Sequence, residues 1–189
     1  MPNWCYNAIE ITGSKDKVKA IWDRASGDNE GGLLDALVPM PSELVPTLDG
    51  KALEEPIDGY THWYDWRLMR WGVKWDVEPD GLIYAEDGDT ATISGYLESA
   101  WSPPLEAFMA YSEANPDVHL EVLYHEEGMD FAGLWRSNGE QAHLDCTHDM
   151  IEPFKAGELG ALESEIMDVF DIVENAELDA EWEKENEQS

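Results

Sequence analysis

Basic residues are scarce in this chain of 189 residues, which has 11 lysines and arginines against 42 aspartates and glutamates and a formal net charge of -31. A field of this sign repels phosphate backbones and anionic lipids, so direct binding to nucleic acid or to a membrane is not expected. No hydrophobic run approaches the roughly 18 residues of a membrane-spanning helix. The first residues show no basic segment followed by an apolar one, so a signal peptide is not expected either.

Cysteines are also few. Cys5 and Cys146 are too few for a disulfide framework, and we expect them to be reduced thiols in a cytoplasmic protein. Hydrophobic residues make up 43% of the chain, which is enough to build a folded core.

The acidic residues are unevenly distributed along the chain. Residues 1–75 contain 12 acidic and 8 basic residues, whereas residues 76–189 contain 30 acidic and 3 basic residues. A salt-adapted surface would spread its acids evenly. The concentration of charge in the second part therefore favours recognition of a basic partner, with ordinary solvation as the alternative.

Alternating and helical periodicities predict the order of the elements. Strands are expected at Asn3–Thr12, Leu82–Ala85, Thr90–Leu97, Val118–Tyr124 and Met129–Trp135, with an edge strand at His143–Thr147. Helices are expected from Ser14 to about Ser26, from Thr61 to Trp71 before Gly72, and from Ser102-Pro103 onward. This order predicts an α+β, ferredoxin-like antiparallel sheet with helices on one face.

The sequence also predicts two parts. Residues 1–150 are expected to form the ferredoxin-like domain, with a loop-rich insertion at about 27–59. Residues 151–189 are expected to form an acidic helical extension and tail. Apolar residues recur there at helical spacing from Leu159 to Val173, while acidic residues at steps of three mark another face: Asp168, Asp171, Glu174 and Glu177.

Four segments together carry a family resemblance. MPNWCYNAIEITG stands at the start, WGVKWD at 71–76, AWSPPLEAF at 100–108 and YHEEGMDFAGLW at 124–135. In this order they resemble the YubB ferredoxin-like domain family of phages, prophages and conjugative plasmids. The resemblance spans roughly residues 1–139 and leaves out the insertion and the part after Pro153. It implies a ferredoxin-like fold and a mobile-element origin, and no established activity.

The segment WYDWRLMRWGVKWD, residues 63–76, combines four tryptophans with three cations. Aromatic residues and cations together are typical of single-strand binding sites, but a strongly acidic protein is a poor setting for one. We therefore predict core packing, with arginine stacked on tryptophan. The predicted core stripe is Tyr60, Tyr64, Leu68 and Trp71, and Trp75 and Asp76 are expected to lead into a strand.

Candidate metal and catalytic groups are weak. His143, Cys146 and His148 offer soft ligands at close spacing, but alternation on a strand would turn His143 away from the other two. Glu126 and Glu127 follow His125 in an expected hairpin turn, which is a poor setting for acid–base catalysis. We predict no enzyme activity, no cofactor and no metal, although the metal question at these three residues stays open.

The acidic surface is the preferred functional feature. Carboxylates three residues apart on a helix are about 4.5 Å apart along the axis, close to the ~3.4 Å phosphate step of a DNA strand. We expect a nucleic-acid mimic that inhibits a basic nucleic-acid-binding host protein, such as a restriction or CRISPR-type effector. The alternative is an accessory or assembly protein of phage or plasmid replication that docks or dimerises through its sheet. The predicted partner-binding residues are Glu126, Glu127, Asp130, Asp168, Asp171, Glu174, Glu177 and Glu181.

Overall fold

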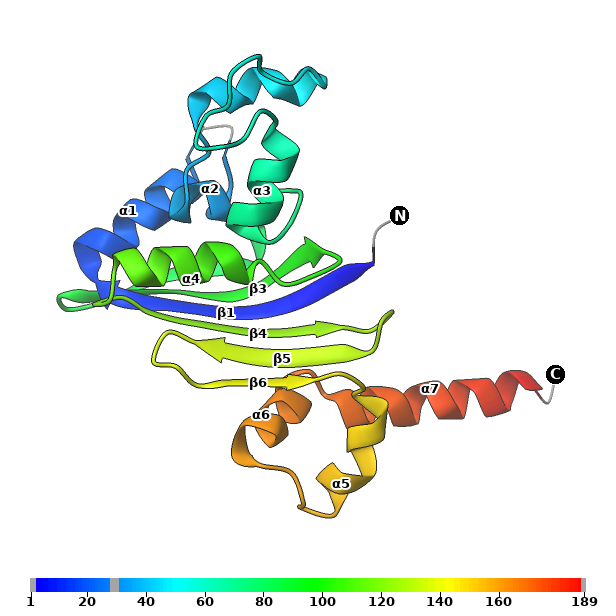
Figure 1. The fold of residues 1–189 in the computed structure, drawn as a ribbon. Helices are drawn as coiled ribbons and strands as arrows, with labels where there is room; N and C mark the ends of the chain where they lie inside the picture. The colour runs from blue at the N-terminus through cyan, green and yellow to red at the C-terminus, as the bar shows by residue number, and fades with distance from the viewer. Residues whose placement is uncertain (1–2, 28–30, 188–189) are drawn as a thin grey trace.

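Six antiparallel strands form one sheet in the order β2-β3-β1-β4-β5-β6 (Figure 1). The structure, a computed structural model, describes residues 3–27 and 31–187, with the side chains of 179–181 and 183–187 outside this description. The strands are β1 Trp4–Ser14, β2 Leu82–Asp87, β3 Thr90–Ala100, β4 His119–Glu126, β5 Phe131–Arg136 and β6 Gln141–Leu144. The order of β1 to β4, with a helix after β1 and another after β3, is the predicted ferredoxin-like α+β fold.

Seven α-helices accompany the described strands. They are α1 Lys15–Ala25, α2 Leu33–Leu37, α3 Trp63–Trp71, α4 Leu105–Ala114, α5 Ile151–Lys155, α6 Ala161–Val169 and α7 Ile172–Glu187, with short 3-10 turns at Ser42–Asp49, Pro79–Gly81 and His148–Met150. Helix α3 ends as predicted, because Gly72 takes a φ of 81°. Helix α4 begins later than predicted: the Ser102 hydroxyl does not cap it but donates a hydrogen bond to the Gly72 carbonyl at 3.1 Å.

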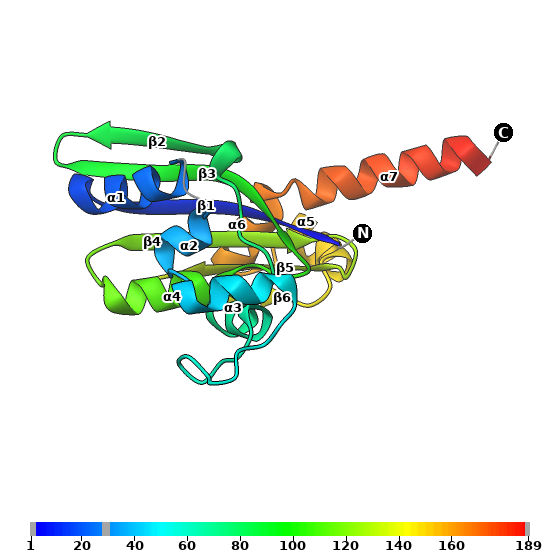
Figure 2. The same cartoon turned by 90° about the horizontal axis from the view of Figure 1, so that it is seen from above.

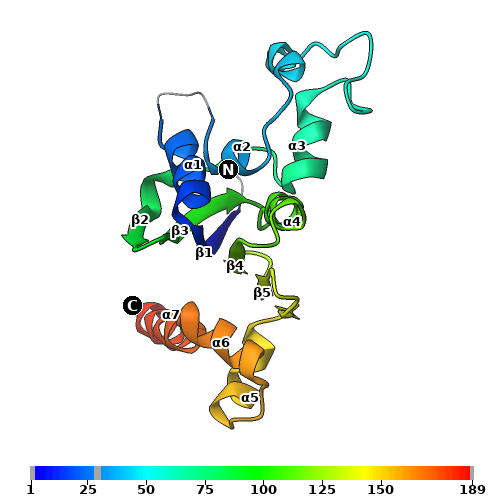
Figure 3. The ribbon, with the colours of Figure 1, turned by 90° about the vertical axis from the view of Figure 1, so that its left-hand side faces the viewer.

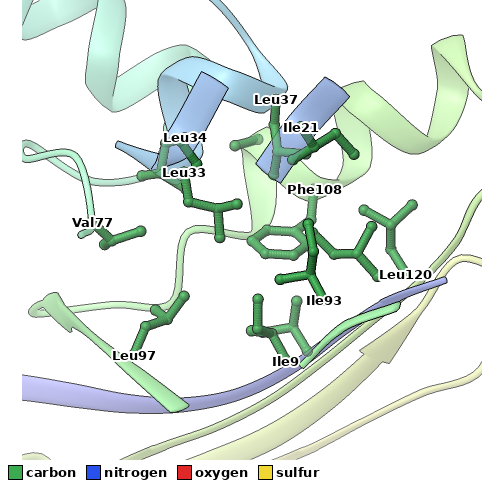
Figure 4. Close-up of a cluster of buried hydrophobic side chains, with 14 of the residues drawn as sticks. Ile9, Ile21, Leu33, Leu34, Leu37, Val77, Ile93, Leu97, Phe108 and Leu120 are labelled. Atoms are coloured by element: carbon green, nitrogen blue, oxygen red, sulfur yellow. The ribbon is translucent and has the colours of Figure 1, made fainter. Parts of the chain in front are cut away.

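The predicted alternation along β1 is present. Cys5, Ile9 and Ile11 are buried on the face of the sheet that α1, α2 and α4 cover, whereas Trp4 and Tyr6 are exposed on the opposite face. Figure 4 shows the resulting cluster, in which Ile9 lies among side chains from α1, α2 and α4. The main core therefore lies between the sheet and these helices.

The insertion between α1 and β2 contributes to this core. Leu33 and Leu34 of α2 and Leu44 of the following turn are fully buried. Asp76 was expected to lead into a strand, and that prediction is wrong. Its carboxylate accepts hydrogen bonds from the Gly32 and Leu34 amides at 2.8 Å and holds the start of α2 in place.

Helices α1 to α4 lie on one face of the sheet, as expected for the ferredoxin-like part, and the helices of the C-terminal extension, α5 to α7, lie on the other face, which the sequence did not predict (Figure 3). The reason is that β4 to β6 are apolar on the second face as well, where Leu123 and Leu134 pack with Ile166 and Met167 of α6 in a separate cluster. Without α6, this second face would be left in water.

The continuous apolar helix predicted from Leu159 to Val173 is interrupted. Helix α6 ends at Val169, and Asp171 takes a φ of 49°, a left-handed conformation that aspartate tolerates better than most residues. This bend lets Ile172 join the second cluster at the start of α7. Beyond its first turns, α7 leads away from the sheet (Figure 2).

No helix in the described part of the chain is long and apolar enough to cross a membrane.

Candidate partner-binding surface

Two hollows open on different faces of the first turns of α7. We call the first the acidic hollow; it measures about 450 Å³ and is lined by Phe154, Met167, Asp168, Asp171, Val173, Glu174 and Glu177. The predicted acidic series of the C-terminal region, Asp168 to Glu177, is thus brought to one space despite the bend in the helix. Glu181 belongs to α7, but its side chain lies outside the described part.

The carboxylates of the acidic hollow are attached to anchored backbone. Met167 and Ile166, which precede Asp168, are buried against the sheet, and Ile172 follows Asp171 into the same cluster. Glu177 pairs with Lys155 at 2.6 Å. Among the described side chains, none of the other three carboxylates has a cation within ion-pair distance. The hollow therefore presents unneutralised negative charge at fixed positions, suited to lysine or arginine side chains.

The second hollow, which we call the hairpin hollow, measures about 370 Å³. It is lined by His125, Glu127, Asp130, Thr147, His148, Ile172, Asn175, Ala176 and Leu178. Glu127 is exposed at the β4–β5 turn, whereas burial lowers the pKa of His125 from its ordinary value. Glu127 and Asp130 are among the predicted partner-binding residues, but nothing in the sequence indicated that α7 would lie beside them, because that depends on packing between distant segments.

Glu126 has an internal role that sequence alone did not reveal. Its side chain is only 1% exposed, and its two carboxylate oxygens accept hydrogen bonds from the amides of Gly128 at 3.0 Å and Met129 at 2.7 Å. These bonds hold the β4–β5 turn. Glu126 cannot reach a partner from this position, so it leaves the predicted partner-binding set.

Asp130 is likewise engaged within the protein. Its carboxylate accepts hydrogen bonds from the Thr147 amide at 3.0 Å, the Thr147 hydroxyl and the Cys146 thiol at 3.0 Å, and it lies 3.1 Å from His148 Nδ1. Burial favours the neutral acid, but the hydrogen bonds from Thr147, Cys146 and His148 outweigh it and lower the pKa of Asp130 to about 2. Asp130 thus fastens the segment after β6 to the β4–β5 turn.

The Asp130 network predicts acid sensitivity. The folded-state pKa of about 2 lies below the usual value of about 3.9, so the stabilisation is complete above about pH 4 and is lost as the pH falls toward 2. When the pH is lowered from about 4 to about 2, the unfolding free energy of the wild type should fall by about 1 kcal/mol more than that of Asp130→Asn. This figure allows for the partial exposure of the carboxylate. Urea unfolding at several pH values measures this difference. The exposed Asp145→Asn control should follow the wild type, and parallel acid profiles for all three proteins would contradict the assignment.

The three soft ligands do not converge. His143 Nδ1 lies 3.0 Å from the Tyr124 hydroxyl, whereas Cys146 and His148 both contact Asp130 on the other side of the segment. Within residues 3–27 and 31–187, no group of three histidine, cysteine, aspartate or glutamate side chains has the geometry to hold a metal ion.

The segment of residues 63–76 contributes Trp66, Trp71 and Val73 to the core, and its buried stripe differs from the predicted one. Trp66 and Trp71 are buried and meet edge to face with centroids 5.6 Å apart, while Tyr64 and Leu68 are exposed. The predicted stacking of arginine on tryptophan is confirmed: the Arg67 guanidinium lies 4.6 Å from the Trp71 ring centroid.

Comparison with known proteins supports the fold assignment. The family model described as the ferredoxin-like domain in Api92-like protein matches residues 71–170. The match ends within the predicted acidic extension, so α5 and α6 belong to the family domain. No curated protein matches the chain.

A similar solved structure is that of protein api92 from Yersinia pseudotuberculosis. It is 11% identical, with a TM-score of 0.48, over 76% of this chain and 98% of that one. The family match over more than half of the residues decides the identity: the chain belongs to the Api92-like proteins and carries their ferredoxin-like domain.

Proposed function

We propose that this protein is a non-enzymatic inhibitor that binds a basic nucleic-acid-binding protein through its acidic surface. The observation that carries the proposal is the acidic hollow, where Asp168, Asp171, Glu174 and Glu177 face one space. Lysine and arginine side chains of the partner would enter this hollow and exchange their counterions for these carboxylates. Nucleic acid would then compete for the same cations.

The support is geometric as well as electrostatic. Glu174 and Glu177 are three residues apart in the first turns of α7, about 4.5 Å along the helix axis, which is within a factor of two of the phosphate step of a DNA strand. The apolar floor formed by Phe154 and Val173 adds contacts that charge alone does not provide.

The resemblance to the YubB family extends the proposal to a biological setting. A phage, prophage or conjugative plasmid would encode the protein, and it would act in the host cytoplasm. Its target would be a restriction or CRISPR-type effector, whose nucleic-acid groove is lined with basic residues. The protein would thus be an anti-defence nucleic-acid mimic.

A charge-neutralising variant tests the acidic hollow. In Asp168→Asn/Asp171→Asn/Glu174→Gln/Glu177→Gln, the side chains keep their size but lose four negative charges. We expect binding to a partner captured from host lysate at low salt to weaken at least about tenfold, because several charge pairs are lost together. Biolayer interferometry with the purified partner measures the affinity, and duplex DNA or RNA should displace the inhibitor.

The matched control changes four exposed acids of the insertion: Asp49→Asn/Glu54→Gln/Glu55→Gln/Asp58→Asn. It alters the net charge equally but lies on the side of the molecule away from α6 and α7 (Figure 1). Its affinity should stay within about twofold of wild type. If both variants weakened binding equally, the partner would be held by general electrostatic attraction and not by the acidic hollow. A partner that binds no nucleic acid would also contradict the proposal.

A second candidate is docking of another protein copy or partner on the sheet in phage or plasmid replication. It is favoured by the face of β1 to β3 that α6 does not cover, where Tyr96 and Ile83 are 61% and 69% exposed beside Trp4 and Tyr6. In that case Tyr96→Lys would abolish the association and neutralisation of the acidic hollow would not. Substitution is a cleaner test than removal of 154–189, which would also expose the second core cluster.

A further inference from the structure

A third hollow, of about 540 Å³, lies within the helical insertion, far along the chain from the acidic surface. Arg24 at the end of α1 and Arg67 of α3 both line it, so two of the chain's 11 cations meet at one place. We call it the arginine hollow. It belongs to the less acidic part of the chain, where residues 1–75 contain 8 basic residues.

The carboxylates of the arginine hollow are already committed. Asp76 accepts the amide hydrogen bonds of Gly32 and Leu34 at the start of α2. Asp35 accepts from Arg24 Nη2 at 2.7 Å and from the Met40 amide at 2.9 Å. Arg24 is thereby neutralised, and neither carboxylate forms an ion pair with Arg67 among the described contacts.

The Arg67 guanidinium contacts two aromatic rings but forms no ion pair with a carboxylate of the described residues. It lies 4.6 Å from the Trp71 ring centroid and 5.1 Å from the Trp63 ring centroid. Both contacts use the faces of the guanidinium and do not involve its N–H edges. Its Nε is buried and has no hydrogen-bond partner in the described structure. Burial also lowers the pKa of Arg67, against the opposing effect of Asp76 and Asp35. Arg67 also lines the hollow, so an anionic ligand there can accept hydrogen bonds from the guanidinium N–H groups that reach it.

The remaining lining indicates the rest of the ligand. Met40, Val45 and Leu48 provide an apolar wall, and Val45 and Leu48 are exposed. Asp35 and Asp76 also line the hollow and would repel the two charges of a phosphate more strongly than the single charge of a carboxylate. A planar carboxylate can still accept two parallel hydrogen bonds from an arginine edge. We propose that the arginine hollow binds a monoanionic carboxylate with an apolar tail, the head group on Arg67 and the tail on Leu48 and Val45.

The test uses hexanoate as the probe, added to the full-length protein. We expect about millimolar affinity by isothermal titration and a shift of the Arg67 Nε–H resonance in ¹⁵N–¹H spectra. Acetate, which lacks the tail, hexanol, which lacks the charge, and hexyl phosphate should each bind at least about tenfold more weakly. A leucine-terminated peptide with a free or amidated C-terminus distinguishes a peptide carboxylate from a free acid as the source.

Variants locate the site. Arg67→Gln should weaken hexanoate binding at least about tenfold, while Arg70→Gln, at an exposed arginine of the same helix, should leave it within about twofold. Leu48→Asp at the rim places a negative charge beside the tail and should also abolish binding, so it decides the matter if Arg67→Gln does not fold. Absence of any hexanoate effect on Arg67, or unchanged affinity in Leu48→Asp, would overturn the proposal.

Discussion

Replacing Trp71 with alanine is expected to lower the free energy of unfolding by about 3–5 kcal/mol. The side chain is fully buried, and its indole Nε1 donates a hydrogen bond to the Val38 carbonyl at 2.9 Å. It also packs edge to face on Trp66 and stacks on the guanidinium of Arg67. Truncation leaves a large cavity, an unpaired carbonyl and a buried cation with less aromatic contact, and urea unfolding followed by circular dichroism measures the loss.

Two variants separate these contributions. Trp71→Phe retains most of the buried volume but loses the hydrogen bond to Val38, so it should cost about 1–2 kcal/mol. Trp75→Ala removes a partly exposed tryptophan outside the helix and should change stability little. If Trp71→Ala and Trp75→Ala were equally mild, Trp71 would not be the side chain that joins α3 to the segment after α2.

Replacing Arg136 with alanine is expected to cost about 2–3 kcal/mol at neutral pH. The side chain is 16% exposed at the end of β5 and pairs with Glu121 of β4 and Glu165 of α6, with Glu140 at 3.2 Å as a third partner. This cation therefore joins the sheet to the helix on its second face. Its loss leaves Glu121 and Glu165 close together and without compensation.

The pH dependence identifies this mechanism. Without Arg136, the carboxylates of Glu121 and Glu165 repel each other while both carry a negative charge. Acid removes this repulsion, so the stability gap to wild type should narrow toward about pH 4, near the ordinary range of glutamate side chains. Urea unfolding at both pH values measures the gap. Lys17→Ala breaks a pair with Asp117 that is open to water, so it should cost little at either pH, and a constant gap for Arg136→Ala would contradict the mechanism.

Much of the fold was predictable because local patterns and short connections decided it. The alternation in β1 and the acidic turn between β2 and β3 set strands and register, since one face of each strand had to be buried. The left-handed glycine after α3 set the end of that helix for a local reason too. The cation–aromatic character of residues 63–76 likewise indicated internal stacking, although not which ring would be buried.

The candidate sites were less predictable, because their residues meet only through long-range packing. Glu126 and Glu127 are adjacent in sequence, yet the first holds a turn inside the protein and the second is exposed. The acidic series near the C-terminus was visible in the sequence, but the bend at Asp171 was not. That bend depends on burying Ile172 against a second apolar sheet face.

By itself, the sequence determined the charge of this protein, the division of that charge along the chain, and the ferredoxin-like order of strands and helices. Only the tertiary structure decided that α6 covers a second face of the sheet, that four carboxylates share one hollow, and that the buried Nε of Arg67 has no hydrogen-bond partner among the described residues. The physical reason is that charge and periodicity are properties of neighbouring residues. Burial and hydrogen-bond satisfaction, in contrast, depend on which distant segments come to lie against each other.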